Sequence, residues 1–273
     1  MKHVEPLEIK LLRPLLGVYS LALLMFLIIP ILVIIPLSFN EGSFLSYPLS
    51  GVSLRWYRDF FSAGIWMPAL VNSLQIAPAA TLLATVLGTL ASVGLSRGEF
   101  RGKTLIMAII ISPMIAPVVI VAVGLYFFFA SWGLLNSYLG LVIAHAVLGV
   151  PFVVITVNAT LQSYHHNFTR AAASLGATPL YGFRRVTLPL IAPGVLSGAL
   201  FAFATSFDEV VVTLFLASPA QRTLPMQMFA GIKENLNPTI AAAATMMVLC
   251  ALTLLLAMEA LRRRNERIRG VKV

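Results

Sequence analysis

Two adjacent carboxylates, Asp208 and Glu209, lie inside a long apolar run of the sequence. A charged side chain at the centre of a bilayer costs about 2.5–3.5 kcal/mol on insertion scales, and such residues usually face a cavity or a partner. On one continuous helix, Phe201, Thr205, Asp208 and Val212 would share a face, flanked by Glu209. Aromatic rings beside carboxylates suit a flexible organic cation, through charge pairing and cation–π contact. We therefore expect Asp208, Glu209, Phe201 and Thr205 to line a substrate path. The alternative is that the acids pair with a basic or hydroxyl group inside the protein.

No pattern typical of catalysis or metal binding accompanies these acids. His145 stands alone in an apolar run, and His165 and His166 are neighbours in a polar stretch, which is too few for the ligands of a tetrahedral metal site. The Gly-Lys-Thr sequence at 102–104 resembles the end of a phosphate-binding loop, but Arg97 stands where that pattern requires glycine. The sequence thus predicts no catalytic residue, no metal site and no cofactor held by this chain.

A polar stretch from Thr169 to Pro189 carries a second pattern. Thr169 can cap a short helix through its side-chain oxygen, and the alanines that follow favour its continuation. Gly176 is a natural stop, because glycine takes the left-handed conformation after a last helical turn. Thr178 followed by proline is typical of the start of another helix. The stretch predicts helix, glycine, helix, with small side chains that fit a partner's groove; the alternative is a surface hairpin without a partner.

The composition excludes a soluble protein. Of the 273 residues, 59% are apolar and 11% are charged, with a mean hydropathy of +0.93, whereas soluble domains have about 45–50% and about 25%. One cysteine, Cys250, excludes an internal disulfide. A net charge of +9 would suggest nucleic acid in a soluble protein. Here the basic residues lie between long apolar runs, so we expect a lipid bilayer and no nucleic acid as the partner.

Six apolar runs are long enough to cross a bilayer, which takes about 20 residues. The first run is longer than a signal-peptide core and no cleavage site follows it, so we expect a retained helix. Pro113 and Pro117 predict a bend in the third run, and Pro151 predicts one in the fourth, because proline removes a backbone donor. The runs are 15–37, 67–95, 105–130, 139–161, 190–217 and 240–261.

Small residues recur at every fourth position of the second run, which lets another backbone approach closely. Either another helix of the same chain or a second subunit packs against this stripe. The stripe consists of Ala80, Ala84, Gly88 and Ser92.

The positive charges predict the orientation of the spans. Of the 19 Lys and Arg residues, only Arg55, Arg58, Arg222 and Lys233 fall outside the termini and the loops after the second and fourth runs. Cytoplasmic segments carry the excess of Lys and Arg, so both termini are expected in the cytoplasm, which requires an even number of spans. The expected organisation is a cytoplasmic N-terminus (1–14), a six-helix transmembrane domain (15–261) with a cytoplasmic loop at about 163–187, and a basic cytoplasmic tail (262–273).

The segment 170–189 resembles the cytoplasmic loop of ABC importer permease subunits. That family has E-A-A-x-x-x-G, nine residues, then I-x-L-P, and this chain has the same spacing from Arg170 to Pro189. The family's acidic first position is an arginine here. In the family this loop forms the coupling helix, which docks into a cleft of the ATPase subunit. The resemblance therefore assigns ATPase coupling to Arg170, Ala171, Ala172, Leu175, Gly176 and Pro189.

Further segments resemble the second permease subunit of polyamine importers. The implied fold is all-α: a polytopic membrane protein with six transmembrane helices and a cytoplasmic coupling-helix loop, the type I ABC importer permease fold, in the bacterial cytoplasmic (inner) membrane. The implied function is a translocation path for a cation of the spermidine and putrescine class. The segments are 72–74, 100–103, 206–213, 223–225 and 238–242.

The resemblance also implies partners. These are a second, related permease that forms a heterodimer with this chain, two ATPase subunits that hold ATP and Mg²⁺, and a periplasmic or extracellular binding protein. This chain would then be no enzyme. Two alternatives stay open: the same importer with an opine, an aminophosphonate, thiamine or ferric iron as cargo, and an ATP-independent channel or secondary transporter. The latter leaves the 163–187 loop without a purpose.

Overall fold

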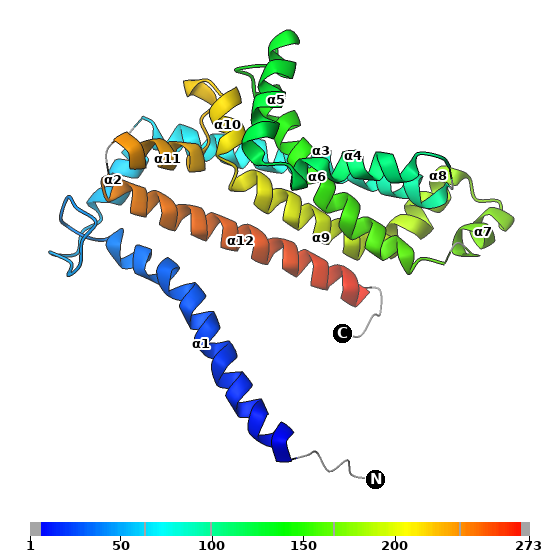
Figure 1. Ribbon diagram of the computed structural model, residues 1–273, viewed down its shortest axis with the longest axis horizontal. Coiled ribbons are helices and arrows are strands. Elements are labelled where there is room, and N and C mark those ends of the chain that lie inside the picture. The colour runs from blue at the N-terminus through cyan, green and yellow to red at the C-terminus, as the bar shows by residue number, and fades with distance from the viewer. Residues whose placement is uncertain (1–6, 63, 99, 166, 235, 269–273) are drawn as a thin grey trace. The chain divides into compact units, whose positions relative to one another are not determined.

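The computed structural model describes residues 7–62, 64–98, 100–165, 167–234 and 236–268, and the regular elements in these ranges are helices. Figure 1 shows them in order from α1 (Leu7–Leu37) to α12 (Thr239–Ile268). The chain divides into two compact units: residues 1–63 with 231–246, and residues 64–230 with 247–273. The all-α class is therefore confirmed. Of the predicted terminal segments, residues 1–6 and 269–273 lie outside the described part.

Within the described ranges, five helical segments are long and apolar enough to cross a membrane, and a bent helix pair supplies a sixth span when it is counted as one. This pair is α4 (Lys103–Ile115) and α5 (Val118–Ser131), which meet at 109°. The five segments are Pro14–Leu37, Trp66–Ser96, Tyr138–Gln162, Pro179–Phe207 and Thr239–Ala257.

The third apolar run is thus not one gently bent helix. Ala116 and Pro117 adopt extended backbone angles (ψ 143° and 127°) between α4 and α5. Proline has no N–H to donate and disfavours the helical conformation of the residue before it. The predicted bend at Pro117 is confirmed, but it is a complete break. By contrast, α6 (Tyr138–Gln162) continues through Pro151.

The smaller unit contains α1, α2 (Arg55–Ser62) and the beginning of α12. The buried Asn40 organises the segment between α1 and α2. Its Nδ2 donates to the carbonyl oxygen of Phe44 (3.0 Å), and its Oδ1 accepts from the backbone N–H of Ser50 (3.1 Å). The indole N–H of Trp56 donates to the carbonyl oxygen of Asn40 (2.6 Å), which ties α2 to this turn.

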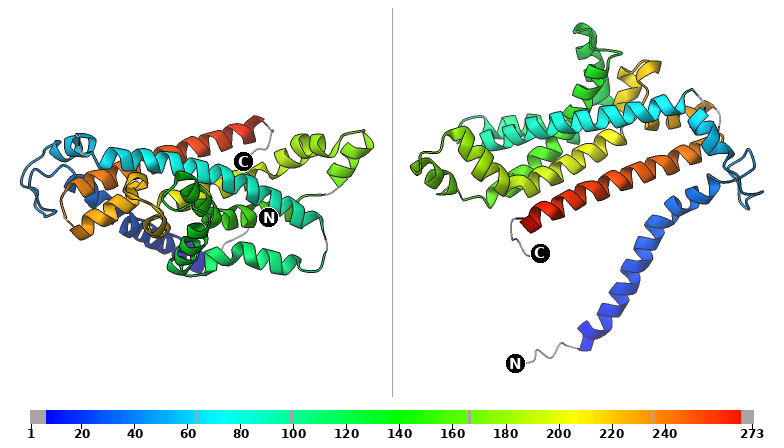
Figure 2. Two further views of the ribbon diagram at one scale, coloured as in Figure 1. Left: turned by 90° about the horizontal axis from the view of Figure 1, so that it is seen from above. Right: turned by 180° about the vertical axis from the view of Figure 1, so that it is seen from behind.

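The larger unit is built on three packed helices, α3 (Trp66–Arg97), α6 and α9 (Leu188–Phe207), seen together in Figures 1 and 2. Small residues let them approach. A Cβ on Gly88 would lie 2.7 Å from Cβ of Val153, and a Cβ on Gly149 would lie 3.0 Å from Ala202 and 3.2 Å from Ala84. The small-residue stripe of α3 therefore packs against helices of the same chain.

The fifth apolar run is also broken, and the prediction of one continuous helix over 190–217 is wrong. Helix α9 ends at Phe207, and α10 (Val211–Leu216) begins after three intervening residues. Val212 is fully buried whereas Asp208 is exposed, so these two residues do not share a face. Helix α10 packs against α5 and also contacts α6, and the α5–α10 pair projects beyond the α3–α6–α9 bundle in Figures 1 and 2.

Candidate functional site

The first candidate region is the loop between α6 and α9, where helix α7 (Asn167–Ser174) ends in a glycine turn. Gly176 has φ +84°. Its backbone N–H donates to the carbonyl oxygen of Ala173 (2.9 Å), and the N–H of Ala177 donates to that of Ala172 (3.0 Å). This pair of bonds is the Schellman motif, which satisfies carbonyl groups at a helix end. The predicted stop at Gly176 is confirmed.

Helix α8 (Pro179–Gly182) follows, and its start is also as predicted. The side chain of Thr178 accepts a hydrogen bond from the N–H of Tyr181, and Pro179 occupies the first turn. A π-helical segment, Phe183–Thr187, leads directly into α9. The loop therefore connects to α9 without an irregular linker.

The expected cap at Thr169 is wrong. Helix α7 begins two residues earlier, and the hydroxyl of Thr169 instead lies 2.6 Å from the hydroxyl of Tyr164. The Tyr164 hydroxyl also lies 3.3 Å from that of the buried Thr187. Tyr164 thus links the segment after α6, helix α7 and the segment that enters α9. The hydroxyl of Thr169 thus contacts a side chain five residues earlier in place of a backbone N–H of its own helix, which the capping rule does not consider.

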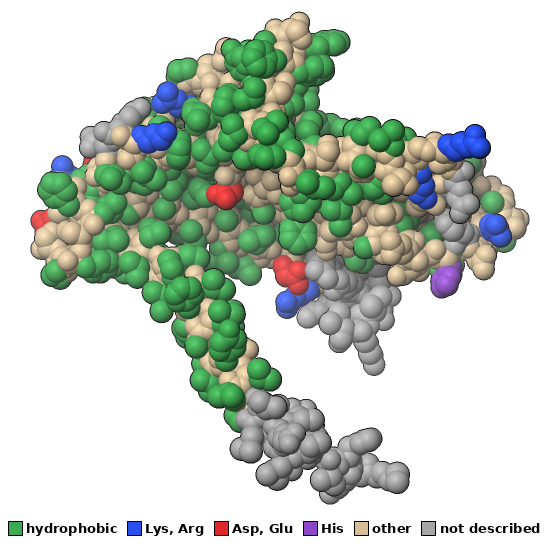
Figure 3. All heavy atoms as spheres, in the orientation of Figure 1, with side chains coloured by type: hydrophobic (Ala, Val, Ile, Leu, Met, Phe, Trp, Pro, Cys, Tyr) green, Lys and Arg blue, Asp and Glu red, His purple; other side chains and the backbone are tan. Residues whose placement is uncertain are grey.

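The turn carries exposed apolar side chains. Leu175 is 88% exposed, Leu180 66% and Tyr181 58%. A hollow of about 490 Å³ lies beside them, lined in part by Ala172, Gly176 and Val186. Figure 3 shows Lys and Arg side chains at the end of the larger unit that carries α7 and α8. Exposed apolar side chains with Lys and Arg side chains around them are typical of a surface that docks on another protein.

The structure brings most of the predicted coupling residues together. Arg170 and Ala171 are exposed on α7, Ala172 is half-buried, and Leu175 and Gly176 form the turn that follows. The remaining residue, Pro189, lies apart from them in the first turn of α9.

The second candidate region is the break between α9 and α10, where the two acids differ. The Oε1 atom of Glu209 accepts a hydrogen bond from the backbone N–H of Val212 (2.8 Å), so this carboxylate caps the start of α10. The side chain of Asp208 is exposed at the end of α9. Of the two, Asp208 is therefore the acid available to a ligand, and Glu209 has a local structural role.

Phe201 lies two turns before Asp208, and both are exposed, as is Ala204 between them. The ring of Phe201 stacks on that of Phe152, with centroids 6.1 Å apart. Thr205 is half-buried. An aromatic ring and a carboxylate thus occupy one side of α9, the arrangement expected for a cation.

Three buried polar residues meet at the break. His145 of α6 is 1% exposed, its Nδ1 lies 2.8 Å from Oγ of Ser206, and its Nε2 lies 3.0 Å from Oγ1 of Thr213. The hydroxyl of Thr213 also donates to the carbonyl oxygen of Glu209 (3.4 Å). In the sequence, His145 is an isolated histidine. The sequence does show polar residues inside two apolar runs, His145 in one and Ser206 and Thr213 in the other. Their spacing alone does not indicate that they meet.

Asn72 is a further buried polar residue, at the beginning of α3. Its Nδ2 donates to the carbonyl oxygens of Ala220 and Arg222 (both 2.9 Å), and its Oδ1 accepts from the hydroxyl of Tyr138 (2.9 Å). These bonds hold the segment after α10 against α3 and α6.

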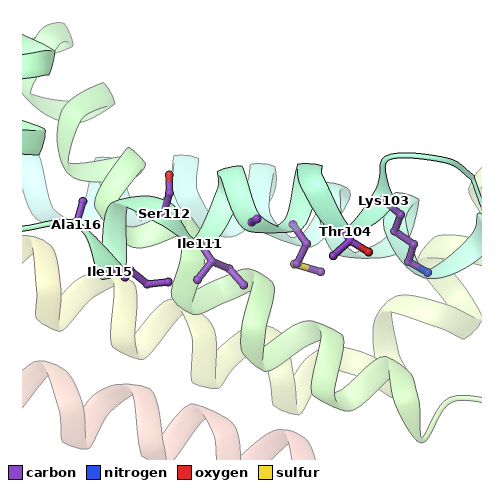
Figure 4. A pocket seen from close by; sticks show the side chains of 8 residues that line it. Lys103, Thr104, Ile111, Ser112, Ile115 and Ala116 are labelled. Carbon is purple, nitrogen blue, oxygen red and sulfur yellow. The ribbon is translucent and has the colours of Figure 1, made fainter.

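A hollow of about 680 Å³ runs along α4, with Lys103 at one end and Ala116 at the other (Figure 4). Its lining is apolar except for Lys103, Thr104 and Ser112. The charged group in it is itself a cation. Because like charges repel, this hollow is a poorer place for a cationic ligand than the exposed side of α9.

Helix α9 connects the two candidate regions along the chain. The helix has 20 residues, which corresponds to about 30 Å at 1.5 Å per residue. The turn at Gly176 precedes its first residue and Asp208 follows its last. The two regions therefore lie toward opposite ends of α9.

Comparisons with known proteins identify the family. Residues 84–267 match the family described as "Binding-protein-dependent transport system inner membrane component". The chain is 31% identical to the spermidine/putrescine transport system permease protein PotC of Haemophilus influenzae over 243 residues, 88% of this chain and 93% of the relative. It is 34% identical to the putrescine transport system permease protein PotI of Escherichia coli over 230 residues, 82% of each chain.

A solved structure shares the fold. A chain from the crystal structure of a bacterial alginate ABC transporter, in complex with an alginate pentasaccharide-bound periplasmic protein, superposes with a TM-score of 0.73. The alignment covers 93% of this chain and 94% of the other at 18% identity. The predicted ABC importer permease fold is therefore confirmed.

Proposed function

The chain belongs to the family of binding-protein-dependent transport system inner membrane components, and from this premise we propose that it forms the translocation path for a polyamine-like organic cation of the spermidine and putrescine class. The observation that carries the substrate class is its identity of 31–34% with PotC and PotI over more than four fifths of its length. The exposed carboxylate of Asp208 beside an aromatic ring supports the same class.

Asp208 would provide the charge that a passing cation meets. A carboxylate in a low-dielectric cavity interacts more strongly with a cation than one in bulk water does. Phe201 offers the face of an aromatic ring to an ammonium group or its alkyl chain. Glu209 and Thr205 would contribute less, because the carboxylate of Glu209 caps α10 and Thr205 is half-buried.

The loop that carries Gly176 would couple this path to ATP hydrolysis. In our proposal, ATP and Mg²⁺ bind to two separate ATPase subunits, and helix α7 docks into a cleft of one of them. This chain is then a transport subunit without catalytic residues or a cofactor of its own. Arg170 would meet an acidic group there, since the family's acidic residue is replaced by a basic one. Leu175 and its exposed apolar neighbours supply the buried contact area.

The remaining partners follow from the same architecture. A second, related permease would complete the path as a heterodimer, and both termini of this chain would lie in the cytoplasm. A periplasmic binding protein would then deliver the cation to the opposite face. The family description, which names a binding protein and the inner membrane, supports this assembly.

The experiment is uptake by the intact complex, reconstituted with its ATPase and binding protein. We expect ATP-dependent uptake of radiolabelled spermidine or putrescine, and no uptake of an opine, an aminophosphonate, thiamine or ferric iron. Asp208→Asn should impair uptake at unchanged complex yield. Glu209→Gln is the matched control, because an amide oxygen still accepts the bond from Val212. Preference for another cargo would refute the substrate class, and ATP-independent uptake without a co-purifying ATPase would indicate a channel or secondary transporter.

A further inference from the structure

The imidazole of His145 connects the two sides of the α9–α10 break. Ser206 lies in the last turn of α9, Thr213 lies in α10, and one ring nitrogen of His145 is within hydrogen-bond distance of each hydroxyl (2.8 and 3.0 Å). All three side chains are buried, between 0% and 4% exposed. The residues of the break between α9 and α10, which include Asp208, lie between Ser206 and Thr213 in the sequence.

Either neutral tautomer of His145 can make this bridge. A neutral imidazole has one donor and one acceptor nitrogen, and each ring nitrogen of His145 faces a hydroxyl that can donate or accept. The hydroxyl of Thr213 also lies 3.4 Å from the carbonyl oxygen of Glu209. The resulting chain runs from the end of α9, through the imidazole of α6, to the backbone of the turn.

We propose that His145 is a positioning residue for the cation path: it holds α9 and α10 at a fixed separation and thereby sets the direction of Asp208. This inference rests on the proposed function of Asp208. The buried imidazole touches no substrate and acts through the two hydroxyls. Packing alone would be satisfied by any apolar side chain of similar size, whereas the bridge requires a donor and an acceptor at opposite ends of one rigid ring.

The first test is transport kinetics with the intact complex in lipid vesicles. His145→Leu fills the space without hydrogen bonds, and Thr213→Val removes one hydroxyl with little change in shape. Each should raise the half-saturating spermidine concentration by about twofold to tenfold, the range expected for a lost hydrogen bond. The maximal rate, the complex yield and the stimulated ATP hydrolysis should stay unchanged. His145→Gln, which can still donate toward Thr213, should lie closer to the unsubstituted protein than His145→Leu.

The matched control is Thr245→Val in α12. Thr245 is also buried (5% exposed), but its hydroxyl donates to a carbonyl oxygen of its own helix, that of Ala241 (2.8 Å). This variant should leave the half-saturating concentration unchanged. If it has the same effect as Thr213→Val, the change reflects the loss of any buried hydroxyl and the inference is overturned. A fall in complex yield for all His145 variants, including His145→Gln, would likewise overturn it in favour of a purely structural role.

A spectroscopic test does not depend on transport. The chain has four histidines, so ¹⁵N-histidine labelling gives few imidazole signals, and the His145 signal is the one lost in His145→Gln. We expect a neutral ring with hydrogen on one nitrogen, an Nε2 shift that changes in Thr213→Val, and an Nδ1 shift that changes in Ser206→Ala. Nitrogen shifts that stay unchanged in both variants would overturn the bridge.

A double-substitution cycle separates this inference from the proposed function. If His145 acts by positioning Asp208, the effect of Thr213→Val on uptake should largely vanish in an Asp208→Asn background, because residues that act as one unit are not additive. If Asp208→Asn alone leaves uptake unchanged, the proposed role of Asp208 and the inference both fail. If Asp208→Asn impairs uptake and the two effects simply add, only the inference is overturned.

Discussion

Replacing Gly176 by alanine should uncouple ATP hydrolysis from uptake while the complex still assembles. Gly176 has φ +84° and forms the turn after α7. An L-residue in the left-handed region costs roughly 1–2 kcal/mol. This cost lowers the equilibrium constant for forming the native turn by about fivefold to thirtyfold. A Cβ there would meet no other described part of this chain within 4 Å. The strain is therefore in the backbone, and the penalty is confined to the loop.

Two further variants separate the backbone from the partner. Gly182→Ala adds the same methyl group in the same loop at φ −59°, again with no described neighbour within 4 Å, so it should be neutral. Gly176→Asn keeps the left-handed turn more readily than alanine does, because asparagine is enriched in that region. If Asn uncouples as strongly as Ala, the added bulk meets the partner's cleft; if Asn is milder, the backbone strain dominates.

The assay measures uptake and stimulated ATP hydrolysis in parallel, in vesicles that contain the complete complex. We expect Gly176→Ala to lower the number of cations taken up per ATP, with a normal yield of the membrane subunits. Normal uptake and normal stimulation in Gly176→Ala would refute the assignment of this turn as the coupling element. If Gly176→Ala and Gly182→Ala lower uptake per ATP equally, backbone strain at Gly176 is not the cause.

Three other expectations test the rest of the structure. Gly88→Ala should force α3 away from Val153 and lower the free energy of unfolding by about 1–3 kcal/mol, as in other overpacked cores, which thermal unfolding would measure. Gly94→Ala in the same helix is the control and should have no such effect, because a Cβ on Gly94 meets no described neighbour within 4 Å. Asn72→Ala removes three hydrogen bonds and should destabilise the complex by about 1–3 kcal/mol, measured by thermal unfolding in detergent. A topology reporter fused after Gly64 should give an external signal, and a cytoplasmic signal would contradict the assigned orientation of every span.

Several features could be predicted because their causes are local in the chain. The turn at Gly176 depends on one glycine and on bonds to carbonyl groups three and five residues earlier. The start of α8 depends on Thr178 and the proline after it. The all-α class and the number of apolar runs follow from composition and length, because a bilayer requires about 20 apolar residues for each span. None of these features requires contacts between distant segments.

The break at Asp208 could not be predicted in this way. No glycine or proline stands between Ala199 and Ala217, so the apolar pattern continues through the acids. Helix α9 ends there because groups far apart in the sequence meet: His145 of α6 bonds to the hydroxyls on both sides of the break. In the turn that results, the carboxylate of Glu209 accepts from the backbone N–H of Val212, whereas Asp208 is exposed.

The sequence by itself therefore determined the six apolar runs, the glycine turn at Gly176 and the presence of two acids in an apolar run. Only the tertiary structure decided the geometry of those acids, the partners of the small-residue stripe and the 109° angle between α4 and α5. The physical reason is the range of the interactions. Helix propensity, capping and glycine turns act over a few residues, whereas the hydrogen bonds of His145 join residues 61 and 68 positions apart.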